Sequence, residues 1–513
     1  MKFPARPASA AVVLLALAAG IWLQAQVLLG PDVGWLIRSV RLMANGAQFG
    51  AQVFEPNLPV AWYLCRPAAW AVEYFGLTEV NAIRLWVWLL AAAALFAARA
   101  CLLAVREAGR ETWLELGAAA VAGCVLVGAS FGQREHLAFL LSLPWLFAIR
   151  LRWDGIAIPA RHAIVAGLAA GIAFSIKPVF VIVPIVVELA LFARRRGSWT
   201  LLRPEVKTMT IAGAVCALVT LVLSPAYLSQ VVPAAFATYW AYDLPVARLL
   251  EDFPVVPAML VGWLVAWFAD FRIARSSGTW LAAFLAWTAS YFVQGRGFDY
   301  QGFPAMASAF VLSVSAIAQL SSGQARAKQL VAIAAVALTT WPTLDAARLS
   351  FAAATEPDWP MSRSVWHREL TALMREHGVG PGKSVFVFST NPSPAFPALN
   401  YLGADWVGPD VAQFLLPAWV RRVEIADPEH RAAIDAAMTV QRRHVHDALI
   451  QGRPDYLLVS RMSRSASPQG AGSRRLDYFA IFGTDPALAE AFNRYQMAAD
   501  WRGVQLYVRK AGE

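Results

Sequence analysis

The sequence is short of charged residues and of cysteine. Only 15% of its 513 residues are Asp, Glu, Lys or Arg, against 58% that are hydrophobic, whereas soluble domains carry about 25% charged residues. This composition excludes a single soluble globule. The 21 Trp and 28 Phe also exclude a disordered chain, which cannot hold so much apolar surface. The four cysteines show no CxxC or Cys/His spacing, so we predict neither a disulfide framework nor a zinc site.

Positive charge exceeds negative charge. The chain has 44 Lys and Arg residues against 34 Asp and Glu, a net charge of +10. In a soluble protein this excess would suggest a nucleic-acid partner. Here the basic residues form short clusters between apolar runs. We therefore expect no nucleic acid and interpret the excess as a signal of membrane topology.

About eleven apolar segments are long enough to cross a membrane as helices, which takes about 20 residues each because lipid offers backbone polar groups no hydrogen bonds. The first follows Lys2 and Arg6 and resembles a signal peptide. No convincing small-residue cleavage site follows it, so we expect a retained helix with a cytoplasmic N-terminus. The segments lie near residues 10–29, 82–104, 113–130, 136–150, 162–176, 178–193, 208–224, 254–270, 278–294, 302–320 and 328–343.

The distribution of basic residues agrees with this map, because cytoplasmic loops collect Lys and Arg. The outer face then receives residues 30–81, 131–135, 225–253 and 295–301, and everything after about residue 344. We predict a multi-pass protein of the inner or plasma membrane. The clusters that share the side of Lys2 and Arg6 are Arg99/Arg106/Arg110, Arg150/Arg152, Arg194/Arg195/Arg196/Arg203, Arg272/Arg275 and Arg326/Lys328.

The composition changes near residue 356, after which charges and turn residues are frequent. Strand-like runs occupy 384–390, 456–460 and 504–509, and helical patterns occupy 362–377 and 429–451. We predict two domains: a membrane domain over residues 1–345 and an extracytoplasmic soluble α/β domain over residues 346–513. The fold class is therefore a polytopic α-helical membrane protein with a C-terminal α/β domain.

The first outer loop opens with Asp32, just before a predicted helix with two distinct faces. Such a helix is expected to lie along the membrane interface. Asp32 either caps this helix through backbone N–H groups or takes part in chemistry. For the arginines, an edge that faces solvent or lipid phosphates is favoured over a catalytic role. The faces are Leu36, Val40 and Met43 on one side and Arg38, Arg41 and Asn45 on the other.

This loop resembles that of the GT-C membrane glycosyltransferases, in particular the protein O-mannosyltransferases and the lipid A aminoarabinose transferases. An Asp after the first helix, an interfacial helix and the segment FEPNLP at 54–59 follow in the same order. The resemblance implies that Asp32 is the catalytic base and that Glu55 is a second acidic residue of the site. The sequence departs from the family where Pro56 and Asn57 replace a Lys-Pro pair.

Two further segments support the resemblance, which covers about residues 1–345. FGQREHLAFLLSLPWLF (131–147) is similar to the second outer loop of the family and places Glu135 at the start of a helix. QGRGFDYQGFPAMAS (294–308) resembles a late outer loop with a basic residue and a tyrosine, here Arg296 and Tyr300. Lys177, at the outer end of a helical hairpin, is a weaker match.

The resemblance implies transfer of a sugar from a polyprenyl phosphate, with inversion at the anomeric carbon. Phosphate is already a good leaving group, so the reaction needs a base for the acceptor hydroxyl, for which Asp32 is suited. It also needs cations for the departing phosphate. Arg296 and Lys177 or Arg134 suit that role, since an arginine fork matches phosphate geometry.

The remaining carboxylates leave alternatives open. Glu55 and Glu135 can bind sugar hydroxyls, tune the site or ligate a divalent metal ion, the one cofactor that we consider. Glu135 can instead form a simple ion pair with Arg134 or His136. His136 has no partner at a metal-ligand spacing.

Two other classes of function are alternatives to the enzyme. A transporter or flippase of a lipid-linked intermediate would also be polytopic with charges inside, but the sequence lacks the paired half-similarity of many transporters. A scaffold or receptor that binds cell-wall material would leave the acidic residues of the loops without a role. The expected partners are a lipid-linked sugar donor, a glycan, lipid or protein acceptor, and membrane lipids.

Overall fold

The computed structural model describes residues 5–252, 277–320, 363–463, 465–467 and 473–511. The chain divides into two compact units, and each consists of separate stretches of sequence. The first unit comprises Met1–Val27, Arg84–Leu218 and Leu244–Pro357, and the second comprises Leu28–Ile83, Val219–Asp243 and Asp358–Glu513. The domain boundary predicted at residue 345 lies outside the described residues and stays a prediction.

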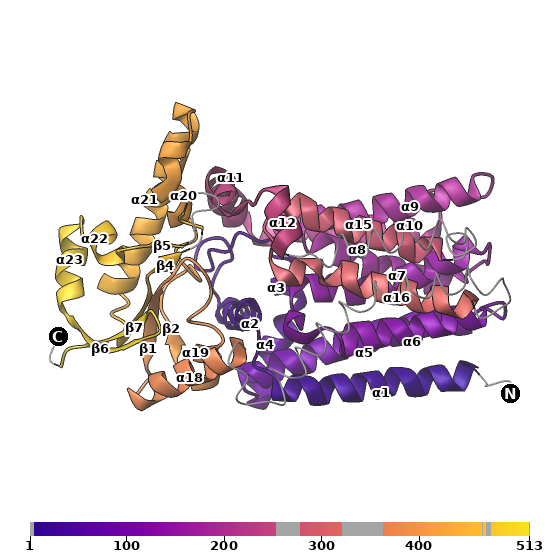
Figure 1. Cartoon of the computed structure of the whole chain (residues 1–513), viewed down its shortest axis with the longest axis horizontal. Helices are drawn as coiled ribbons and strands as arrows, with labels where there is room; N and C mark the ends of the chain where they lie inside the picture. Colours follow the sequence, from indigo (N-terminus) through magenta and orange to yellow (C-terminus); the bar gives the residue numbers. More distant parts are fainter. Residues whose placement is uncertain (1–4, 253–276, 321–362, 464, 468–472, 512–513) are drawn as a thin grey trace. The chain divides into compact units, whose positions relative to one another are not determined.

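The first unit is built from long helices (Figure 1). Each predicted apolar segment within the described residues overlaps a helix, whereas 254–270 and 328–343 lie outside them. The unit contains α1 (Ala5–Gln26), most of α5 (Glu79–Leu103), α6 (Arg110–Cys124), α7 (Arg134–Trp153), α8 (Ala160–Ser175), η2 (Pro178–Val181), α9 (Ile182–Arg195), most of α10 (Pro204–Leu223), α12 (Val246–Asp252), α15 (Gly278–Gln294), η5 (Asp299–Gly302) and α16 (Phe303–Leu320).

Four stretches of helix among the described residues are long and apolar enough to cross a membrane: Ala8–Gln26, Glu79–Leu103, Pro204–Leu223 and Asp299–Ala318. Large apolar side chains stand exposed on several of them, for example Leu15 at 69% and Leu218 at 58%. Water would disfavour such faces, and lipid would not. The helices therefore indicate a membrane protein, while the count of eleven spans stays a prediction.

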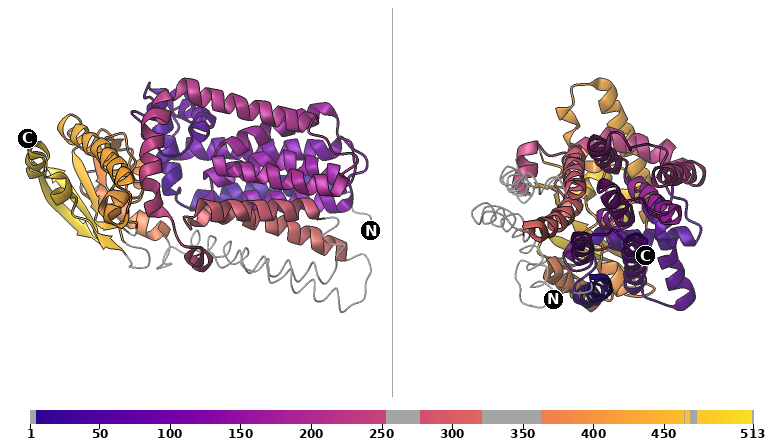
Figure 2. Two further views of the ribbon diagram at one scale, coloured as in Figure 1. Left: turned by 90° about the horizontal axis from the view of Figure 1, so that it is seen from above. Right: turned by 90° about the vertical axis from the view of Figure 1, so that its right-hand side faces the viewer.

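Among the described helices of the first unit, α7 is the most enclosed, with nearly every residue buried from Arg134 to Trp153. It packs most extensively against α8 and also against α6, α9, α15 and α16, several of which are seen end-on in Figure 2. Ion pairs hold its C-terminal turn. Arg150 Nε lies 3.1 Å from Glu115 Oε2, and Glu115 also accepts a hydrogen bond from Ser315 on α16.

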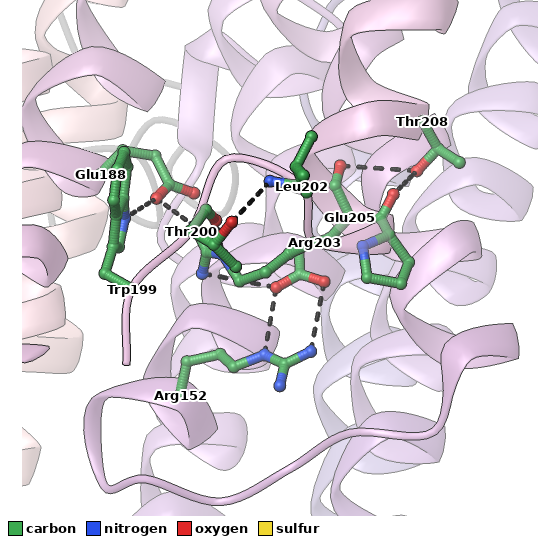
Figure 3. A network of polar contacts seen from close by, with 9 residues as sticks. Arg152, Glu188, Trp199, Thr200, Leu202, Arg203, Glu205 and Thr208 are labelled. Carbon is green, nitrogen blue, oxygen red and sulfur yellow. Dashed lines mark hydrogen bonds and ion pairs between the residues drawn. The ribbon is translucent and has the colours of Figure 1, made fainter. Parts of the chain in front are cut away.

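A second network extends from the same turn of α7 to α9 and α10 (Figure 3). Arg152 Nε donates to Glu205 Oε1 at 3.1 Å, and Arg203 pairs with both Glu205 and Glu188. Glu188 also accepts a hydrogen bond from Trp199 at 3.0 Å. Basic residues that the sequence suggested only as topology signals therefore also tie helices together through buried ion pairs.

The second unit contains the first predicted outer loop, part of a later one and the C-terminal region. Its helices include α2 (Pro31–Ala44), α3 (Val60–Leu64), α4 (Arg66–Phe75), α11 (Val232–Thr238), α18 (Arg363–Glu376), α19 (Ala398–Leu402), α20 (Leu416–Arg421), α21 (Pro428–Ile450), α22 (Tyr478–Phe482) and α23 (Pro486–Asn493). The helix predicted just after Asp32 is confirmed as α2, which begins one residue before Asp32, and those predicted at 362–377 and 429–451 are confirmed as α18 and α21.

A five-stranded sheet forms the centre of the C-terminal region, with strand order β2-β1-β3-β7-β6. Strand β1 (Ser384–Phe388) runs parallel to β2 (Asp405–Trp406) and β3 (Tyr456–Ser460), while β7 (Val504–Arg509) is antiparallel to β3 and to β6 (Tyr495–Trp501). Phe386, Phe388 and Leu457 pack with residues of α21, α22 and α23 in one apolar core. The predicted strands β1, β3 and β7 are confirmed, and β2 and β6 are additional.

Candidate functional site

Helix α2 carries Asp32 and packs closely against α19 of the C-terminal region. At Gly34 an added Cβ would lie 2.4 Å from Asn400 Oδ1 and 3.3 Å from Pro397 Cα, so only glycine allows this approach. Asn400 Nδ2 donates to the Gly34 carbonyl at 3.0 Å. The C-terminal region thus braces the helix that the sequence predicted to lie along the membrane interface.

The arginines of α2 are not a free edge of the helix, which corrects the sequence-based expectation. Arg38 is 6% exposed and forms a two-pronged ion pair with Glu79 at 2.7 and 3.2 Å. Arg38 Nη1 also donates to the Ala404 carbonyl at 2.7 Å. Arg41 and Asn400 donate to the same Glu79 carboxylate at 2.7 and 2.6 Å. Ion pairs from both arginines to Glu79 therefore fix α2.

Asp32 occupies the first turn of α2, as its second residue. The N-cap residue is Gly30, so Asp32 is not the cap that the sequence left open as an alternative. Its side chain is partly exposed, whereas the residues from Val33 to Val40 behind it are buried. The geometry is that of a carboxylate on a rigid support that still has an accessible side.

Glu55 is only 4% exposed and is held by the same helix. Trp35 Nε1 donates to Glu55 Oε2 at 2.9 Å, and the Asn57 backbone N–H donates to Oε1 at 3.1 Å. The neighbouring Pro56 carbonyl accepts a hydrogen bond from Tyr227 at 3.2 Å. Asn57, which departs from the family pattern, is thus one of the groups that orient Glu55.

In the first unit, Glu135 and Lys177 form a buried ion pair. Lys177 Nζ also donates to Gln294 Oε1 at 2.9 Å and lies 5.6 Å from the centre of the Tyr300 ring. Glu135 is fully buried, and within the described residues its Oε2 has no hydrogen-bond partner. A buried carboxylate oxygen without a donor is costly, so this atom can accept a hydrogen bond from a hydroxyl group.

Two other predicted residues of the first unit, Arg134 and Arg296, stand next to residues of this cluster in sequence, beside Glu135 and two residues after Gln294 respectively. Arg134 precedes Glu135 and is 7% exposed, and Arg296 follows α15 in the loop that leads to η5. The alternative in which Glu135 pairs with Arg134 or His136 is wrong for His136. Its Nδ1 accepts from the Gly132 N–H at 3.1 Å and its Nε2 faces the Gly123 carbonyl at 2.8 Å.

The structure groups the predicted residues by unit. Asp32 and Glu55 belong to the second unit, and Arg134, Glu135, Lys177, Arg296 and Tyr300 belong to the first. Within the described stretches, no three His, Cys, Asp or Glu side chains form a group that could hold a metal ion. The divalent ion considered from the sequence stays a prediction.

Three functional side chains were missed by the sequence-based reasoning. Glu79 and Asn400 hold α2, but they stand far from it in sequence and no local pattern links them. Gln294 had a signal, because it opens the segment QGRGFDYQGFPAMAS. No protein-family model and no curated protein matches this chain.

Proposed function

We propose that the chain is a membrane glycosyltransferase that moves a sugar from a polyprenyl-phosphate donor to a cell-envelope acceptor on the outer face, with inversion. The observation that carries this proposal is Asp32, a partly exposed carboxylate on a helix that is buried from Val33 to Val40 and braced by ion pairs. A general base must be reachable by its substrate and fixed in orientation. The order of short motifs shared with GT-C enzymes supports the same assignment.

In the proposed reaction, the acceptor hydroxyl oxygen forms a bond to the anomeric carbon while its proton passes to the Asp32 carboxylate. The bond between that carbon and the phosphate oxygen breaks, and polyprenyl phosphate leaves with the bonding electrons. Arg296, with Lys177 or Arg134, would stabilise the phosphate charge. Glu135 would accept a hydrogen bond from a sugar hydroxyl through its second carboxylate oxygen, and Tyr300 would line the donor-binding site. Glu55 would tune the site or contact the sugar.

The transporter or flippase reading remains the alternative, and one assay separates the two functions. The purified protein in nanodiscs is given a lipid-linked sugar and a crude envelope acceptor fraction. The enzyme should release polyprenyl phosphate and glycosylate the acceptor. In liposomes, movement of the lipid between leaflets without glycosyl transfer would support the transporter instead.

The topology of the proposal gives a direct test. A reporter fused after residue 345 should behave as extracytoplasmic, and a reporter fused after Arg196 should behave as cytoplasmic, because basic residues cluster in cytoplasmic loops. A cytoplasmic signal from the fusion after residue 345 would mean that the predicted odd number of helices is wrong. The C-terminal region would then face away from the outer leaflet.

Arg296 offers a test of donor binding. Arg296→Ala should weaken binding of the lipid-linked donor by roughly 2–5 kcal/mol, the usual cost of removing one partner of a partly desolvated charge pair. Binding is measured with the purified variant in nanodiscs, with Arg194→Ala as a control because Arg194 is an exposed arginine near the C-terminal end of α9. Unchanged affinity in Arg296→Ala would reassign Arg296 to a structural ion pair with Asp299.

A further inference from the structure

The segment that carries Glu55 is held on the C-terminal region through its neighbour Phe54. The Phe54 N–H donates to the Pro409 carbonyl at 2.9 Å, and Phe54 pairs with Asp410 as a parallel β-bridge. The fully buried Phe54 ring meets the His444 imidazole edge-on, with ring centres 4.9 Å apart. The ring also stacks on Phe414, with ring centres 5.8 Å apart, so backbone pairing and two ring contacts fix the residue that precedes Glu55.

His444 is itself anchored by a buried carboxylate. Its Nδ1 lies 2.8 Å from Asp410 Oδ2, and Gln441 Nε2 donates to the same oxygen at 2.9 Å. Asp410 is 4% exposed, and both His444 and Gln441 lie on α21. Phe54 therefore contacts the backbone of Asp410 and the ring of His444. The hydrogen bond between His444 and Asp410 joins these two residues to each other.

The surroundings of His444 raise the pKa of its imidazole. Burial lowers the pKa of the imidazole, but the Asp410 carboxylate raises it and the net shift is upward from the ordinary value. The other charges that act on it are Asp447, which raises the pKa, and Arg443, which lowers it, both on α21, while the Phe54 segment contributes an uncharged ring. Stabilisation by the charged pair is therefore complete below the unfolded pKa and is lost as pH rises through the folded pKa.

We propose that His444 is a positioning residue that holds the Glu55 segment in place in a pH-dependent manner. In its protonated form the imidazolium binds Asp410 by a charge-assisted hydrogen bond and keeps the ring against Phe54. When the proton is lost, the imidazole donates to Asp410 as a neutral group. This hydrogen bond is weaker, and the contact between His444 and Phe54 loosens. The consequence for sugar transfer rests on the proposed function, whereas the positioning itself does not.

Amide hydrogen exchange of the peptide that spans residues 49–58 tests the positioning without any substrate. With intrinsic exchange corrected for pH, wild-type protection should be high at acidic pH and fall as pH rises through the raised pKa of His444. In His444→Gln the protection should no longer depend on pH, because glutamine has no proton to lose. The matched control is His446→Gln, since His446 pairs with Asp447 on the same helix; it should behave as wild type. Equal pH dependence in His444→Gln and wild type would overturn the proposal.

A second variant protects the test against misfolding. If His444→Gln fails to give the wild-type fluorescence spectrum, Phe54→Leu is used, because it keeps the backbone hydrogen bond and removes the ring contacts with His444 and Phe414. Its 49–58 peptide should lose the pH dependence while the β1 amides stay protected; retained pH dependence would again reject the role of His444.

Transfer is measured separately, as kcat and KM against pH. A wild type without transfer at any pH would reject the proposed function and leave the exchange result valid.

Discussion

Asp32→Asn is expected to lower glycosyl transfer by roughly 10²–10⁴-fold, the contribution that a general base typically makes. The amide cannot accept the proton of the acceptor hydroxyl. It has nearly the same size as the carboxylate, and the N-cap residue of α2, Gly30, is unchanged. Fold and donor binding should therefore stay near wild type. The measurement is turnover by the purified protein in nanodiscs with a lipid-linked sugar.

Glu55→Gln is the companion variant for this experiment. A glutamine oxygen still accepts from either Trp35 or Asn57, but its NH₂ group then faces the other donor. If Glu55 positions the site, transfer should fall by less than in Asp32→Asn. Turnover of Asp32→Asn at the wild-type rate would remove the base assignment.

The second large effect is an expected loss of stability when Glu79 is replaced. Glu79→Ala leaves Arg38 buried without its carboxylate, and breaking a buried ion pair costs about 3–5 kcal/mol. Asn400 loses an acceptor at the same time. In detergent, thermal unfolding followed by tryptophan fluorescence should show a midpoint lower by about 10 °C.

Two further variants make the stability result interpretable. Glu73→Ala removes an exposed carboxylate from α4 and should change stability by less than about 0.5 kcal/mol. The double variant Arg38→Met/Glu79→Leu removes the charges on both sides and should recover part of the loss, because an apolar pair needs no counter-charge. A wild-type midpoint for Glu79→Ala would mean that the ion pair does not stabilise α2.

Local composition was sufficient for most elements of secondary structure. Long apolar runs predicted the helices of the first unit, because a helix satisfies its backbone hydrogen bonds within one segment. Strands β1, β3 and β7 were predicted for a similar reason, as short β-branched and aromatic runs between turn residues. Strand β6 was missed because YQMAADW lacks a regular apolar alternation. It exists as a strand through its pairing with β7.

The sequence also indicated candidate site residues, but it could not predict which groups would surround their side chains. Asp32, Glu55 and Glu135 were singled out from short motifs and their order along the chain. Burial and partners came only with the fold: Glu135 pairs with Lys177, 42 residues away, whereas the ring of its neighbour His136 bonds to Gly132 and Gly123. An ion pair is selected by distance in space, about which local sequence carries little information.

By itself, then, the sequence determined that this is a mostly helical, lipid-compatible chain with a C-terminal α/β region and acidic residues in its loops, because composition and periodicity act over a few residues. The tertiary structure decided that residues 28–83 and 219–243 form one unit with the C-terminal region. It also decided that Arg38 is buried on Glu79 and Ala404, from 41 and 366 residues away. A buried cation must be neutralised and hydrogen-bonded by whichever groups the fold brings to it.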